Sequence, residues 1–217
     1  MGVPLSVLSI DETHEIAIIE MGANSQGEIK FLSEISMPNI GVITNIGKAH
    51  LEGFGGIEGV QKGKTELYRY LAKTNGIIFY NTEDKRLVQS LPNTTKNYSY
   101  SIHLVSQISN HPFVRFSFKG VEIQSNLSGA YNLTNMVVAL VLGEYYGLST
   151  EELKQGIEDY KPDNNRSQIK KTERNTLILD AYNANPSSMH ESVNNLKSHP
   201  HPLKTLILGH MLELGES

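Results

Sequence analysis

The chain has 217 residues, of which 39% are hydrophobic and 19% charged, and its formal net charge is -4 at pH 7. These values are typical of a globular protein with a sizeable core. They argue against a nucleic-acid-binding protein, which needs a basic surface. There is no cysteine, and the longest apolar run, residues 136–142, is too short to span a bilayer. We therefore expect a cytoplasmic protein that does not insert into a membrane.

Two short apolar runs near the N-terminus each end in polar residues. Residues 16–19 precede Glu20, and residues 40–43 precede Thr44. Both predict buried parallel strands, whose carboxyl ends face the crevice where α/β proteins bind ligands. Glu20 is therefore a candidate contact for a metal ion or a ribose, although a solvated turn glutamate fits the same pattern. Between the two runs, residues 28–35 are typical of a helix.

The stretch of residues 39–71 combines a strand, a glycine-rich loop and a helix. Its loop carries Lys48, His50 and Glu52, which are candidates for chemistry at the strand end. In the helix that follows, Lys64 lies within an apolar stripe at helical spacing. An ammonium group buried there must be paired, neutralised or modified, because unpaired burial is costly. A Lys64 side chain that extends to solvent is equally compatible with this spacing.

Residues 59–65, GVQKGKT, look like a P-loop but do not fit one. The motif has four residues between its glycines and follows a strand directly. Here three residues separate Gly59 from Gly63, and the strand ends at Ile43. We therefore do not expect Lys64 to act as a P-loop lysine.

The middle of the chain continues the alternation of strands and helices. Residues 77–80 predict another parallel strand, which favours a doubly wound α/β sheet. Residues 113–118 and 121–124 alternate with period two, which predicts an antiparallel hairpin extending the edge of that sheet. Ser149 and Glu152 form a capping-box pattern for a helix.

A strongly apolar helix is expected over residues 129–145. Asn132 and Asn135 lie on one face of its first turn. Paired amides can contact an adenine edge, but spacing alone favours helix capping.

Residues 161–165 form a polar linker, after which a second unit begins. A strand at residues 176–179 ends in Asp180, a helix capped by Ser188 follows, and a further strand is expected at residues 205–208. This is a Rossmann-like β-α-β unit. Two parallel strands cannot complete such a sheet, so we expect the unit to be truncated.

Several ordered motifs resemble those of the Mur ligases. They are IEMGA at residues 19–23, GEI at 27–29, TNIG at 44–47, AHLEGFG at 49–55, DAYNANP at 180–186 and GHMLELG at 209–215. The resemblance is strongest to the D-alanyl-D-alanine-adding member. It implies that residues 1–163 are the central ATP-binding domain without its N-terminal P-loop part. Residues 164–217 would be the beginning of the C-terminal ligase domain.

The resemblance also implies a reaction in peptidoglycan precursor synthesis. ATP phosphorylates the terminal carboxylate of UDP-MurNAc-tripeptide, and the amine of D-Ala-D-Ala attacks the acyl phosphate. The chain alone, without its P-loop part, is expected to be inactive. Glu20 and His50 would bind Mg²⁺, and Lys64 would be carbamylated. Nucleotide contacts are implied for Asn132, Asn135, Arg166, Asp180, Asn183 and Asn185.

Three positions depart from the family pattern. Tyr131 replaces a histidine, Asn165 a glycine and His210 an aspartate. Two alternatives stay open at this point. Folylpolyglutamate synthases share the central domain and the carbamylated lysine but not the last two motifs, and a catalytically silent nucleotide-sugar binding module is the other alternative.

Overall fold

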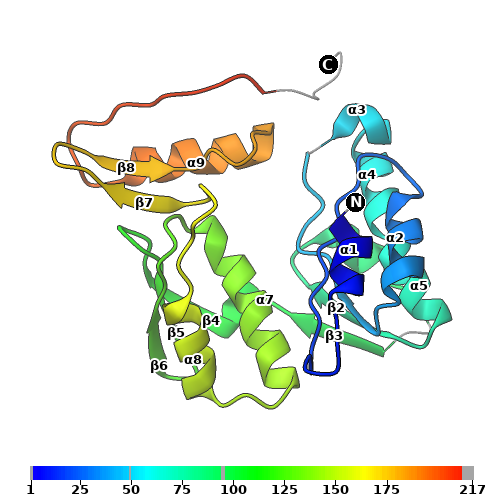
Figure 1. Cartoon of the computed structure of the whole chain (residues 1–217). Helices are drawn as coiled ribbons and strands as arrows, with labels where there is room; N and C mark the ends of the chain where they lie inside the picture. The colour runs from blue at the N-terminus through cyan, green and yellow to red at the C-terminus, as the bar shows by residue number, and fades with distance from the viewer. Residues whose placement is uncertain (1, 49, 94–95, 212–217) are drawn as a thin grey trace. The chain divides into compact units, whose positions relative to one another are not determined.

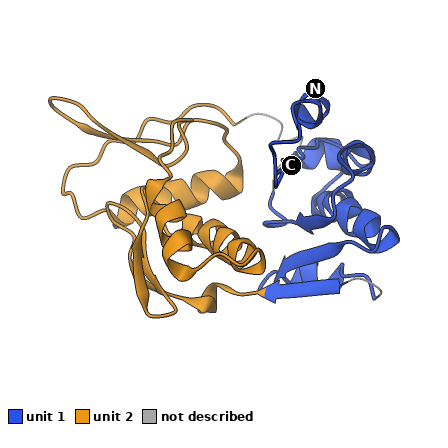
Figure 2. Ribbon diagram, turned by 60° about the horizontal axis from the view of Figure 1, so that its bottom comes forward, with its two compact units in different colours: residues 1–99, 213–217 blue, residues 100–212 orange. Residues whose placement is uncertain are grey.

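A computed structural model describes residues 2–48, 50–93 and 96–211 (Figure 1). The chain divides into two compact units between residues 99 and 100 (Figure 2). Within the described ranges, no helix is long and apolar enough to cross a membrane.

The first unit is an α/β unit built around a three-stranded sheet in the order β1-β2-β3. Strands β1 and β2 are parallel, with Ile40 opposite Ile77, which confirms the two expected parallel strands. The expected helix at residues 28–35 is confirmed as α2. The elements are α1 (Gly2–Leu8), α2 (Glu28–Ser36), β1 (Ile40–Val42), α3 (Leu51–Phe54), α4 (Ile57–Lys64), α5 (Glu66–Lys73), β2 (Ile77–Asn81), α6 (Lys85–Gln89) and β3 (Lys96–Tyr100).

The core of this unit lies between α5 and the sheet. It is formed by seven buried side chains, Ile29, Ile43, Leu67, Tyr68, Leu71, Ile78 and Leu87. Gly41 of β1 permits the close approach of α5, since a Cβ atom there would lie 2.6 Å from Cδ1 of Leu71. The sheet and α5 therefore pack without space for a larger residue at this position.

The helical stripe after the glycine-rich loop is confirmed, but it belongs to two helices. Val60, Leu67 and Tyr68 are buried, and Lys64 is half-buried. Thr65 separates the two helices, as the C-cap of α4 and the N-cap of α5. The Thr65 hydroxyl donates to the Gln61 carbonyl at 2.8 Å, and the Thr65 N–H donates to the same carbonyl at 3.0 Å. Residues 59–64 are helical rather than a phosphate-binding loop.

The strand predicted at residues 16–19 is wrong. The segment has no regular secondary structure, and Ile18 is 91% exposed. A strand requires a hydrogen-bonded neighbour, and among the described residues β1 pairs with β2 alone. The apolar run therefore remains without a strand partner in this part of the chain.

The second unit contains two antiparallel sheets and three α-helices in its described part. The predicted hairpin is confirmed as β5 and β6, but it pairs with β4 in a separate sheet and does not extend the parallel one. The elements are η1 (Ile102–Leu104), β4 (Val105–Ser109), β5 (Arg115–Phe118), β6 (Val121–Gln124), α7 (Tyr131–Tyr145), α8 (Thr150–Asp159), β7 (Gln168–Lys171), β8 (Thr176–Leu179) and α9 (Pro186–Ser198). The capping box of Ser149 and Glu152 at α8 is confirmed.

The strand at residues 176–179 is confirmed as β8, but its partner was not expected. It pairs with β7 in an antiparallel hairpin, because Thr172 and Asn175 close a tight turn through a 2.8 Å backbone hydrogen bond. The strand expected at residues 205–208 is absent from the described structure, where Ile207 is 91% exposed. The described β8 is therefore part of a hairpin and not of a parallel β-α-β unit.

The helix after β8 also begins differently from the prediction. Asn185, not Ser188, is the N-cap of α9, and its Oδ1 accepts from the Ser188 N–H at 2.9 Å. Pro186 occupies the first helical position, where its missing N–H costs nothing.

Candidate functional site

Lys64 lies at the end of α4, beside the carboxyl end of β1. Its Nζ donates to the Asn45 carbonyl at 3.0 Å. Burial lowers the pKa of Lys64, and the nearby Asp84 carboxylate opposes that shift. The amine therefore loses its proton more readily than an exposed lysine, which makes it a better nucleophile toward small electrophiles.

Asp84 follows β2 and contacts the segment that follows β1. Its carboxylate accepts from the Ile46 N–H at 3.2 Å, and it caps α6 through two further backbone N–H groups. An open pocket of about 450 Å³ lies at this strand end, lined by Ile46, Asn81, Glu83, Asp84, Lys85 and Arg86. Sequence reasoning did not single out Asp84, although it lies only four residues after the end of the strand predicted at residues 77–80. The strand edge at which parallel sheets bind ligands thus carries a shallow polar depression that is open to solvent.

The other expected residues of this unit lie on its loops. Glu20 is exposed in the segment before α2, and Glu52 is exposed in α3. His50 precedes α3 in the left-handed region, with φ of 53°. Hydrogen bonds from Asn24 and Ser25 lower the pKa of Glu28, and the charge of His50 adds to that effect. No described contact joins Glu20, His50 and Lys64, and their convergence stays a prediction.

The described residues contain no group of three His, Cys, Asp or Glu side chains that could hold a metal ion. A magnesium ion that arrives with a nucleotide needs no such group. It takes most of its ligands from phosphate and water and only one or two from carboxylates. The exposed carboxylate of Glu20 suits that donor set, whereas the imidazole of His50 suits it less.

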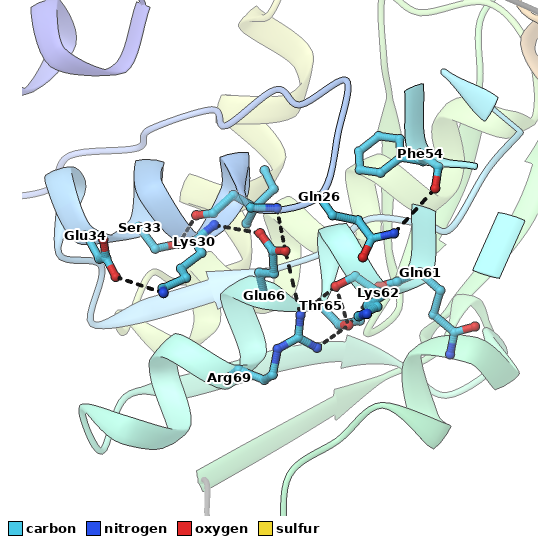
Figure 3. A network of polar contacts seen from close by, with 12 residues as sticks. Gln26, Lys30, Ser33, Glu34, Phe54, Gln61, Lys62, Thr65, Glu66 and Arg69 are labelled. Atoms are coloured by element: carbon cyan, nitrogen blue, oxygen red, sulfur yellow. Dashed lines mark hydrogen bonds and ion pairs between the residues drawn. The ribbon is translucent and has the colours of Figure 1, made fainter. Parts of the chain in front are cut away.

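A buried carboxylate supports the helices around this region (Figure 3). Glu66 of α5 accepts from the Gly27 N–H at 2.7 Å and from the Lys30 N–H at 2.9 Å, at the start of α2. Gly27 has no side chain to cap that helix. Arg69 donates to the Lys62 carbonyl at 2.7 Å and so links α5 to α4. The loop before α2 is therefore tied to the helix pair that carries Lys64.

In the second unit, four polar side chains meet between the start of α7 and the end of β8. The hydroxyl of Tyr131 lies 2.7 Å from Ser167 Oγ and 3.1 Å from Asp180 Oδ2. Asn132 is buried, and its amide donates to Ser167 Oγ at 2.9 Å and to the Ser128 carbonyl at 2.7 Å. Asn132 and Asp180 are thus linked through Ser167, and their role in nucleotide binding stays a prediction.

Arg166 and Asn135 present exposed polar groups in the same unit. The guanidinium of Arg166 stacks on the Tyr182 ring at 3.6 Å from its centroid. Asn135 is exposed, in contrast to Asn132. Asn183 accepts from the neighbouring Ala184 N–H at 2.8 Å. Asn165 has φ of 57°, a conformation that asparagine tolerates better than most residues and that glycine adopts freely.

Sequence reasoning missed Ser167 and Tyr182. Ser167 is almost fully buried, with φ of 50°. The family resemblance indicates its neighbour Arg166 and not this serine. Tyr182 lies inside the DAYNANP motif, but nothing local indicates that its ring supports Arg166. His210 is exposed, and the structure shows no role for it.

Residues 1–143 match the family model described as the Mur ligase middle domain. The chain belongs to the Mur ligase family. It is 34% identical to a UDP-N-acetylmuramoyl-tripeptide–D-alanyl-D-alanine ligase of Bacillus subtilis and 37% identical to one of Haemophilus influenzae. Each alignment covers 100% of this Mur ligase chain and 49% of the relative. The chain thus spans about half the length of the curated relatives it matches.

Solved structures of Mur ligases have the same fold. The crystal structure of MurF from Acinetobacter baumannii matches with a TM-score of 0.87 and 27% identity, over 99% of this chain and 49% of that one. The MurF ligase of Thermotoga maritima in complex with ADP matches with a TM-score of 0.80 and 24% identity, over 99% and 52%. The α/β fold class and the family resemblance of the motifs are therefore confirmed.

Proposed function

We propose that the protein is an ATP-dependent ligase that adds D-Ala-D-Ala to UDP-MurNAc-tripeptide in the cytoplasm. The observation that carries the proposal is the similarity of the whole chain, at 34% and 37% identity, to two enzymes of that name. The open polar depression at the strand ends and the Tyr131–Asp180 cluster are compatible with a nucleotide-dependent reaction.

In the proposed reaction, a carboxylate oxygen of the tripeptide attacks the γ-phosphorus of ATP and ADP leaves. The amine of D-Ala-D-Ala then attacks the carbonyl carbon of the acyl phosphate, loses a proton, and phosphate leaves. Both steps develop negative charge on oxygen, so positively charged groups and backbone donors accelerate them. Arg166 is the proposed phosphate contact, because its exposed guanidinium is held flat on Tyr182.

Lys64 is proposed to act as a carbamate. Its neutral amine adds to carbon dioxide and releases a proton, which converts a half-buried cation into an anion able to face a metal ion. The lowered pKa supports this step, since the neutral amine is the reactive form. Glu20 and His50 are the proposed Mg²⁺ ligands, and the ion would neutralise charge on the transferred phosphoryl group.

The nucleotide is proposed to bind in the second unit. Asp180 accepts a ribose hydroxyl, and Asn135 contacts the adenine from its exposed position. Asn132 supports this end of the site from the buried cluster, and Asn183 and Asn185 shape the loop after β8. We further propose a domain boundary between residues 163 and 164, with the central ATP-binding domain before it and the start of the C-terminal ligase domain after it.

The test is turnover by the complete gene product that contains these residues. Mass spectrometry of the product and phosphate release should show ligation with UDP-MurNAc-tripeptide, D-Ala-D-Ala and ATP, and none with glutamate and a folate. Ligation of glutamate to folate would favour a folylpolyglutamate synthase. Nucleotide-sugar binding without turnover would favour a silent binding module.

A variant pair tests the role of Lys64. Lys64→Ala should lose most of the activity and regain part of it with added short carboxylic acids, which replace the carbamate. Lys62→Ala, an exposed lysine of the same helix, is the matched control and should keep its activity. Undiminished turnover by Lys64→Ala would contradict the carbamate.

A further inference from the structure

The polar cluster of the second unit forms a directed chain of hydrogen bonds. The Nδ2 amino group of Asn132 can only donate, and it donates to Ser167 Oγ at 2.9 Å. The Tyr131 hydroxyl donates to Asp180 Oδ2 at 3.1 Å. The remaining contact, 2.7 Å between Tyr131 and Ser167, must then be donated by the serine. Each hydroxyl in the chain accepts one hydrogen bond and donates one.

The surroundings of Tyr131 favour donation in this direction, toward the Asp180 carboxylate. Burial, together with the nearby Asp180 charge, raises the pKa of Tyr131 to about 12, so the phenol stays protonated. A hydrogen bond donated to a carboxylate is roughly twice as strong as one between neutral groups. Each member of a satisfied chain also polarises the next, which fixes the geometry of the last acceptor, Asp180.

Two backbone hydrogen bonds next to this cluster hold the residues on both sides of Arg166. The Ser167 N–H donates to Asp180 Oδ1 at 3.3 Å, and the Ala181 N–H donates to the Asn165 carbonyl at 2.8 Å. Each Asp180 oxygen therefore accepts one internal hydrogen bond and keeps a further acceptor site for a ligand. Asp180 is half-buried, so such a site is within reach of a hydroxyl group.

We propose that Tyr131 is a positioning residue for the nucleotide: its hydroxyl holds the Asp180 carboxylate in the orientation that accepts a ribose hydroxyl of ATP. The inference rests on the proposed function, in which Asp180 contacts the ribose. It assigns a role to the tyrosine that stands where the family pattern has a histidine. Tyr131 itself need not touch the ligand.

The experiment measures binding of ATP, 2′-deoxy-ATP and 3′-deoxy-ATP to the complete gene product by calorimetry. Tyr131→Phe keeps the ring and removes only the hydroxyl. It should weaken ATP binding about tenfold, the effect of one hydrogen bond to a charged group, and change binding of the analogue that lacks the contacted hydroxyl less than about twofold. Ser167→Ala breaks the chain one step earlier and should show the same selective loss.

Tyr146→Phe is the matched control, because it removes the hydroxyl of an exposed tyrosine at the other end of α7. It should leave all three affinities unchanged. Equal weakening of all three nucleotides by Tyr131→Phe would indicate a merely structural role and overturn the proposal, as would no change at all.

The outcomes separate this inference from the proposed function. Nucleotide binding without ligation by the unmutated protein would refute the ligase, while the selectivity between the nucleotides would still decide the role of Tyr131. If the unmutated protein binds none of the three nucleotides, both proposals fail.

Discussion

Glu66 provides a sharp test of how the first unit is held together. Its carboxylate accepts two backbone hydrogen bonds at the start of α2, from Gly27 at 2.7 Å and Lys30 at 2.9 Å, and its side chain is only 10% exposed. A helix begins with N–H groups that lack intrahelical partners, and a carboxylate there also interacts favourably with the helix dipole. Glu66 therefore caps α2 from another helix, in the place of a local capping residue.

The expected cost of Glu66→Ala follows from these two bonds. Each hydrogen bond to a charged group contributes about 1.5–3 kcal/mol, and the two share one carboxylate, so we expect a total of about 3 kcal/mol. Glu66→Gln keeps one acceptor oxygen and should cost about 1–2 kcal/mol. Arg69, whose guanidinium lies 4.0 Å from the carboxylate, adds little because it is half exposed.

Hydrogen exchange followed by mass spectrometry is the appropriate assay, since a chain of two units need not unfold in one step. Peptides that cover residues 24–36 should exchange faster in Glu66→Ala, by about two orders of magnitude for a loss of about 3 kcal/mol. The matched control is Glu34→Ala, which removes an exposed glutamate from α2 itself and should change exchange very little. Equal acceleration in the two variants would refute the capping argument.

Three further predictions concern charged groups. Competitive amine labelling of Lys64, followed by mass spectrometry, should show a titration midpoint below that of the exposed lysines, because burial lowers its pKa; a midpoint equal to theirs would contradict this. Tyr182→Leu should raise the KM for ATP about threefold through loss of the ring beneath Arg166, whereas Tyr182→Phe should leave the KM unchanged. Equal KM values for the two variants would exclude the stacking role. Burial, with the charges of His199 and Lys204, lowers the pKa of His111, so the unfolded chain binds the extra proton and stability should fall as the pH drops below 6.5. Urea unfolding at about pH 7.5 and about pH 5 measures how much unfolding free energy is lost on acidification. This loss should be smaller for His111→Gln than for the unmutated protein, and an equal loss would contradict the role of His111.

The sequence alone determined the features that depend on neighbouring residues. Strands β1 and β2, helix α2 and the hairpin of β5 and β6 follow from the spacing of apolar residues. The capping box at α8 follows from two residues three positions apart. The spacing of apolar residues allowed either a buried Lys64 or one that extends to solvent, and the structure shows a half-buried side chain.

Tertiary structure decided which segments meet. The 176–179 strand pattern says nothing about its partner, and pairing with β7 turned an expected parallel unit into a hairpin. The contacts of Glu66 with the start of α2 span 39 and 36 residues, and those of Tyr131 with Ser167 and Asp180 span 36 and 49. Propensity and periodicity act over a few residues, whereas a buried carboxylate or hydroxyl takes its partner from whichever segment the packing brings near.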